Sequence, residues 1–200
     1  MQLILALSEA LAWGFKIYGW MIVVAFLLTW VDADKSNGIV RFINRYTYPF
    51  WAWLSTKLPR SLVPFAPLVA LFLVDFGEIF FPGALRSFGG TLVERLVLEE
   101  GLYNLALYFG LATILVARSL VMFLLMLCIL YFVFTLVAPP VTNPFVRSVV
   151  WMLDPMLRPL QRLLPRAKLD LSPIVLAVGL YLLMTLMAPV AISLQTQLTV

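Results

Sequence analysis

Long apolar runs alternate along this chain with shorter stretches that mix prolines, arginines and leucines. A helix needs about 20 apolar residues to cross a hydrocarbon core about 30 Å thick, and four runs reach approximately that length or exceed it. In chain order, these runs are residues 3–31, 64–81, 102–138 and 173–194. The pattern predicts an all-α membrane protein with about four transmembrane helices.

The two mixed stretches, residues 37–67 and 143–173, are copies of each other in a gapless register of 106 residues. Ten pairs are identical between 37 and 69: Asn37/Asn143, Val40/Val146, Arg41/Arg147, Pro49/Pro155, Leu54/Leu160, Leu58/Leu164, Pro59/Pro165, Arg60/Arg166, Pro67/Pro173 and Val69/Val175. A repeated unit of helix, basic segment and helix indicates a tandem duplication. We therefore expect a first repeat at 1–81, a linker at 82–102 and a second repeat at 103–200.

The first apolar run is longer than a single span requires. Residues 3–31 would form a helix about 43 Å long, so this helix must tilt, protrude or break. Gly14 and Lys16 mark the expected break. The second span is expected to end at Phe81, before a proline.

The region between the repeats and the third apolar run raise the same question of helix ends. Within the linker, residues 91–100 could form a short helix with one apolar side on the membrane surface. In the third run we expect a span at 120–137 and a separate preceding helix at 103–117, because the whole run would be about 55 Å long as one helix.

Composition agrees with the hydropathy pattern and removes most catalytic apparatus. The chain is 63% hydrophobic and 12% charged, against about 25% charged residues in soluble domains. Histidine is absent, so the commonest general base and zinc ligand is missing. The single cysteine, Cys128, lies inside an apolar run and has no intrachain partner for a disulfide. We expect no enzymatic activity, no cofactor and no metal.

Charge predicts the orientation, because cytoplasmic connections between spans carry an excess of lysine and arginine. Each mixed stretch, with its flanks, carries five cations against two aspartates. The linker has two arginines against three glutamates, and the carboxyl-terminal tail is uncharged. Both basic segments are therefore expected at the cytoplasmic face, with both termini and the linker outside. Two spans per repeat then make the repeats parallel, related by an axis along the membrane normal.

The second basic segment carries helix-start signals at its two ends and in its middle. Asn143 and Pro144 are typical of a cap and first helical turn. Asp154 and Pro155 repeat that signal, and Pro159 then predicts a bent element made of two pieces. At the far end, Asp170 and Ser172 precede Pro173 and are expected to cap the final span.

Cations recur through both basic segments at positions suited to lipid headgroups or a partner surface. Arg158, Arg162 and Arg166 follow one another at four-residue intervals beside the leucines at 157, 160, 163 and 164. This spacing predicts arginines at headgroup level and leucines in the acyl boundary. The full set of expected lipid-binding or partner-binding residues is Arg41, Arg45, Arg147, Arg158, Arg162 and Arg166.

The second segment resembles the YggT family, also called YlmG, of bacterial, cyanobacterial and plastid membrane proteins. The residues that carry the resemblance are Asp154, Pro155, Pro159, Arg162, Leu163, Leu164, Pro165, Leu169, Asp170, Leu171, Ser172 and Pro173. One arginine of the family's usual pair is Gln161 here. The first segment departs further, with Trp53, Thr56, Pro64 and Ala66 at the positions of Pro159, Arg162, Asp170 and Ser172.

The resemblance implies a multi-pass protein of the bacterial cytoplasmic (inner) membrane, in the two-repeat form. Family members have been linked to haem attachment on a plastid b-type cytochrome, to nucleoid or division-site organisation, and to osmotic tolerance. The resemblance therefore implies an assembly or organising factor for membrane complexes, with protein partners in the membrane and no catalytic residue.

Two other classes of function compete with that expectation. Lys16, Asp75, Glu78 and Arg118 are ionisable residues at or within apolar runs, and such groups are candidates for a channel or transporter of ions or small solutes. The competing interpretation places all four near the outer interface. The basic segments could also bind nucleic acid, but their interleaved leucines favour lipid headgroups instead.

Overall fold

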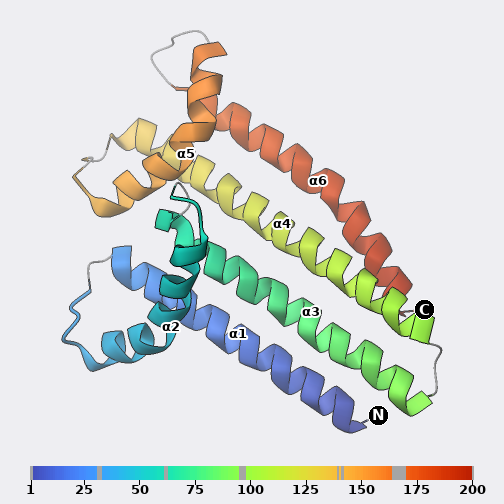
Figure 1. Cartoon of the computed structure of the whole chain (residues 1–200). Coiled ribbons are helices and arrows are strands. Elements are labelled where there is room, and N and C mark those ends of the chain that lie inside the picture. Colours follow the sequence, from blue (N-terminus) through green and yellow to red (C-terminus); the bar gives the residue numbers. More distant parts are fainter. Residues whose placement is uncertain are drawn as a thin grey trace. The chain divides into compact units, whose positions relative to one another are not determined.

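The computed structural model describes residues 2–30, 33–60, 63–94, 98–138, 140, 142–163 and 170–199. These residues form six α-helices and one short 3-10 helix, and no strand occurs in them (Figure 1). In order, the elements are α1 (Gln2–Trp30), α2 (Gly38–Lys57), η1 (Val63–Phe65), α3 (Ala66–Glu94), α4 (Leu98–Val137), α5 (Pro144–Leu163) and α6 (Ser172–Thr199).

Four of these helices, α1, α3, α4 and α6, are long and apolar enough to cross a membrane. The prediction of an all-α protein with four transmembrane helices in two repeats is confirmed, and the chain is a multi-pass membrane protein. The helices group into two compact units, Met1–Val116 with Ile192–Val200, and Ala117–Ala191. We describe each unit by itself.

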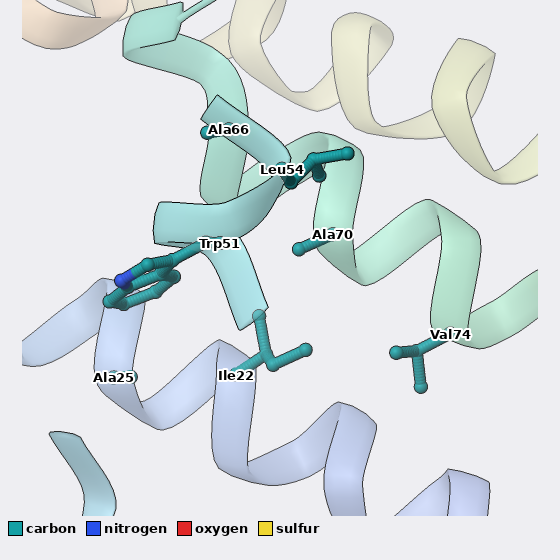
Figure 2. Packing of buried hydrophobic residues seen from close by; sticks show 7 residues of the cluster. All are labelled: Ile22, Ala25, Trp51, Leu54, Ala66, Ala70 and Val74. Atoms are coloured by element: carbon teal, nitrogen blue, oxygen red, sulfur yellow. The ribbon is translucent and has the colours of Figure 1, made fainter. Parts of the chain in front are cut away.

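The first unit is built on the pairing of α1 with α3. Its buried core joins Ile22 and Ala25 of α1, Trp51 and Leu54 of α2, and Ala66, Ala70 and Val74 of α3. Figure 2 shows the Trp51 ring beside Ala25 and Leu54 close to Ala70. α2 therefore lies across both spans and is fixed to them by its apolar face.

Glycines allow α1 and α3 to approach closely. A Cβ added at Gly77 would lie 2.5 Å from the ring of Phe15, and one added at Gly89 would lie 2.5 Å from a methyl group of Ile4. In hydrocarbon, helices gain little from burying apolar surface, so close van der Waals packing between small residues is what holds them together. The same unit contains the first part of α4, where Tyr108 covers Gly83 of α3.

The second unit repeats this plan with α5 in the place of α2. Its core joins Val149, Leu153 and Leu157 of α5 to Val121, Leu127 and Cys128 of α4 and Leu180 of α6. The three α5 side chains are almost completely buried. α5 is therefore fixed to the two spans of its own unit.

The structure corrects the expected ends of two spans. α1 is continuous through Gly14 and Lys16, so the expected break there is wrong. The second span does not end at Phe81, because α3 continues through Pro82 to Glu94. A proline removes one backbone hydrogen bond, but the residues beyond Pro82 pack against α1 and α4, and this packing keeps them helical.

Two expected helix pairs are each one helix. α4 runs from Leu98 to Val137 without interruption, in place of separate helices at 103–117 and 120–137. α5 is likewise one helix that contains Pro155 and Pro159, so the predicted division into two pieces is not confirmed. Leu153 and Leu157 are buried on either side of Pro155, and their packing offsets the backbone hydrogen bond that this proline removes.

Candidate functional site

The basic helices α2 and α5 begin with the same cap. The backbone amide of Phe145 donates to the side-chain oxygen of Asn143 at 2.9 Å, and that of Ile39 donates to the side-chain oxygen of Asn37 at 2.9 Å. Pro144 is the first residue of α5. The predicted cap and first turn are confirmed, and the duplicated asparagines perform the same structural task.

α5 presents two different faces. Val146, Val149, Leu153 and Leu157 are buried, whereas Arg147, Arg158 and Arg162 are exposed. The prediction that Leu157 enters the acyl boundary is wrong, because Leu157 is 1% exposed and packs in the core of its own unit. The periodicity identified the apolar face correctly but not the surface that covers it.

Arg158 forms an ion pair with Asp154, one turn earlier on the same helix, at 2.5 Å. The Arg158 side chain is 68% exposed, so solvent screens the pair and its effect on stability is small. Arg147 and Arg162 form no ion pair within the part of the chain that the structure describes. These two guanidinium groups are therefore available to an external anion.

A polar cluster ties the end of α5 to the start of α6. We use this term for Gln161, Asp170, Ser172 and Tyr131. The Gln161 side-chain amide donates to one carboxylate oxygen of Asp170 at 2.7 Å, and the backbone amide of Ser172 donates to the other at 2.9 Å. Asp170 thus satisfies the first backbone amide of α6, as predicted, while it also binds α5.

Ser172 and Tyr131 complete the polar cluster. Ser172 is 1% exposed, and its side chain lies beside the Asp170 carboxylate, where it helps to lower the pKa of that group. Tyr131 of α4 interacts with Gln161 and lies within the electrostatic field of Asp170. A tyrosine near the end of an apolar run carries one polar atom that needs a partner, which is the signal that sequence reasoning did not use.

Hydrogen bonding keeps the Asp170 carboxyl ionised. Burial would raise its pKa, but hydrogen bonds from the side chain and backbone of Ser172 and from Gln161 outweigh burial and lower the pKa. The donors stabilise the charged form. Gln161 is therefore a hydrogen-bond donor to this carboxylate. In the sequence, it stood out only as a departure from the arginine pair.

The remaining family-type residues have structural positions. Pro155 and Pro159 lie on the exposed side of α5, and Pro173 is buried in the first turn of α6. Arg41 and Arg45 are exposed on α2. Pro165 and Arg166 lie outside the described residues.

The ionisable residues of the apolar runs lie well inside their helices. Lys16 is halfway along α1, exposed, with its amine 5.2 Å from the centre of the Trp13 ring. Asp75 and Glu78 are half-buried, and α3 extends 16 residues beyond Glu78. Arg118 is halfway along α4.

One polar contact across the first unit was not anticipated. Arg86 of α3 donates from Nε to the hydroxyl of Ser8 on α1 at 2.8 Å, and Ser8 is completely buried. The Ser8 hydroxyl in turn donates to the backbone carbonyl of Leu5 at 2.8 Å. The serine therefore links an arginine to the backbone of the neighbouring span. Among the described residues, no group of three or more histidine, cysteine or carboxylate side chains could hold a metal ion.

Comparison with known proteins identifies the family. A family model described as CCB3/YggT matches residues 4–85 and 110–191. The two matched stretches begin 106 residues apart, which is the register of the internal repeat. Neither the curated proteins nor the solved structures give a match. Since the family model covers both repeats and most of the chain, the protein belongs to the CCB3/YggT family.

Proposed function

We propose that this protein is a non-enzymatic organising or assembly factor for membrane complexes in the bacterial cytoplasmic (inner) membrane. Its basic helices α2 and α5 lie at the cytoplasmic interface, where they dock on anionic lipid and on protein partners in the membrane. Both termini lie on the outer side. The larger number of cations in the two basic segments than in the linker supports this orientation.

The proposal depends on one observation: one face of α5 is buried in the core of its unit, and the opposite face is exposed and cationic. The apolar face is occupied by contacts with α4 and α6, so it is not available to a partner. The opposite face presents Arg147 and Arg162, which have no ion pair in the described part of the chain. A helix that is packed against two spans on one face and carries exposed cations on the other is suited to binding acidic protein surfaces and headgroups.

The polar cluster supports the same proposal. Its groups bond to one another, and they hold the end of α5 against the start of α6. A helix fixed at this end presents its arginines in a defined geometry, which lowers the entropy cost of binding a partner. We assign the polar cluster a structural role in presenting α5 and no catalytic role.

Crosslinking in intact cells tests the proposal. The wild-type chain should capture a reproducible set of membrane proteins by pull-down and mass spectrometry. Replacing Arg147 and Arg162 with glutamine should remove most of that set while four spans remain inserted. A matched variant replaces Arg41 and Arg45 on α2, again two exposed cations, and shows which of the partners depend on α2. If the α5 variant keeps every partner of the wild type, the docking proposal is wrong.

A second candidate function, a channel or transporter for ions or small solutes, is favoured by one observation. Asp75 and Glu78 lie well inside α3, and ionisable groups at membrane depth are functional candidates by default. Replacing them with asparagine and glutamine tests it under osmotic stress. The organising-factor account expects unchanged growth and expression. Loss of ion-linked behaviour at normal expression would favour the transporter.

A further inference from the structure

The second unit has an apolar groove between α4 and α6, with a volume of about 350 Å³. This volume falls within the usual range of ligand-binding clefts, about 300–1,000 Å³. Side chains of Leu125, Ile129 and Phe132 line the α4 side, and Pro173, Ala177 and Tyr181 line the α6 side. The lining consists almost entirely of carbon, so the groove suits a hydrocarbon chain.

The residues that separate the groove of the second repeat from the close helix packing of the first can be read from the equivalent positions. At the position of Leu125, α1 has Gly19, where an added Cβ would lie 3.6 Å from Val74 of α3. At the position of Gly77, which admits the Phe15 ring, α6 has Leu183. The glycines that let α1 and α3 close together are therefore replaced by leucines in the second repeat.

One end of the groove is connected to the end of α5 through the bond between Gln161 and Asp170. Pro173 lines the groove, and three residues earlier Asp170 binds Gln161. The next residue of α5 is Arg162, which is exposed and has no ion pair in the described part of the chain. An arginine binds a phosphate group through two parallel hydrogen bonds. An apolar groove whose end is connected to the segment that carries this arginine has the two features that a phospholipid needs, a surface for an acyl chain and a cation for the phosphate.

We propose that this groove binds one acyl chain of an anionic glycerophospholipid whose phosphate is held by Arg162. The groove residues belong to helices long and apolar enough to span a membrane, so hydrocarbon chains surround them. The inference deepens the lipid part of the proposed function and rests on it. It makes α4 and α6 the two sides of a lipid site and assigns the phosphate contact to α5.

Native mass spectrometry of the full chain in a neutral detergent tests the site. Phosphatidylglycerol and phosphatidylcholine with identical acyl chains are added at equal concentration. The wild type should retain one phosphatidylglycerol, at least about fivefold more than phosphatidylcholine, since a surface cation favours an anionic lipid by about that factor. Arg162→Gln should remove the preference, whereas Lys16→Gln, which removes an exposed cation on α1, should keep it.

A second variant tests the groove itself. Val178 lines the groove but is 54% exposed, so Val178→Trp obstructs the groove without disturbing the core. It should lose the retained lipid, while Leu186→Trp, on the same helix outside the groove, should keep it. Circular dichroism confirms that both variants are folded.

Photocrosslinking of the wild type gives a measurement that needs no variant. Phosphatidylglycerol with a diazirine on its acyl chain should label 125–132 and 173–181 in preference to α1 and α3. Even labelling of all spans, lipid retained by Val178→Trp, or a lipid-free dimer that covers the groove would overturn the proposal. The partner pull-down is a separate readout, so loss of lipid with partners retained would contradict the lipid site alone.

Discussion

The two repeats share the same arrangement of helices, but they differ where the basic helix ends and the following span begins. In the second repeat, this place is occupied by the polar cluster of Tyr131, Gln161, Asp170 and Ser172. The equivalent positions of the first repeat are Ala25, Ser55, Pro64 and Ala66. Ala25 and Ala66 are buried in the core of the first unit, and the Ser55 hydroxyl donates to the backbone of its own helix. Both repeats therefore retain the core contacts of the basic helix, but within the described residues only the second has a polar connection between that helix and the start of the next span.

The shared part of the scaffold is visible in the buried positions of the two basic helices. Val40 and Val146 are equivalent and both buried, as are Thr47 and Leu153. Trp51 and Leu157 form a third equivalent pair. The register of 106 residues thus describes packing as well as sequence. The first repeat, as far as the structure describes it, has the same arrangement of helices without a polar cluster. We therefore infer that the cluster of the second repeat has a role besides folding.

The largest expected effect concerns the side of the membrane on which each repeat places its basic helix. Cysteines at Ser36 and Thr142, both exposed, should resist a membrane-impermeant maleimide in intact cells that lack Cys128. A cysteine at Gln2, also exposed, should react. Opposite labelling of Ser36 and Thr142 would show that the repeats are not parallel.

The next effect concerns the buried face of α5. Leu153 is completely buried, so Leu153→Ala should lower the free energy of unfolding by about 2–5 kcal/mol through the cavity it leaves. At the equivalent position, Thr47→Ala removes much less volume and should cost clearly less. Thermal unfolding in detergent compares the two variants. Equal losses would mean that the two basic helices do not depend on their core contacts in the way described.

A smaller effect is expected from exchanging the residues that set helix spacing. Gly77→Leu gives α3 the residue that α6 carries at Leu183, and the new side chain must displace the Phe15 ring. Overpacking of this kind costs about 1–3 kcal/mol. Leu183→Ala removes an exposed side chain and should change the free energy of unfolding by less than about 0.5 kcal/mol.

The smallest effect is the pH dependence of the polar cluster. Hydrogen bonds lower the pKa of Asp170 below its ordinary value of 3.8, so its stabilising effect is present above that pH and is lost as the pH falls through the lowered pKa. Asp170→Ala should cost about 1 kcal/mol at pH 7, as expected for a lost cap. Melting curves should show this cost shrinking below pH 3.8. A cost that is the same at both pH values would show that the charge is irrelevant.

Hydrophobic pattern and the repeat predicted the four spans, because burial in a bilayer demands long apolar helices whatever their neighbours are. The same reasoning failed at Pro82, where the proline favours a helix end but packing against α1 and α4 keeps the helix continuous. Periodicity also could not show that Leu157 meets α4 and α6, since an apolar face looks the same whether protein or lipid covers it.

The polar cluster was only partly predictable. Asp170 before a proline marks a helix start in any context, and the prediction needed no tertiary contact. Gln161 is nine residues away, and its bond to Asp170 depends on where the intervening chain returns. Tyr131 is further still in sequence and comes from a different helix. Gln161 and Tyr131 could not be predicted as partners of Asp170 because they are distant from it in the sequence, although their chemistry is suitable.

Hydrogen exchange at the amides of α5 measures whether the polar cluster holds the end of this helix, a connection that α2 lacks in the described part of the first repeat. Gln161→Ser with Asp170→Pro gives the second repeat the residues of the first. In nanodiscs, the last two turns of α5 should then exchange faster than in the wild type, while α2 is unchanged. Unaltered exchange in α5, or equal acceleration in α2, would contradict the account.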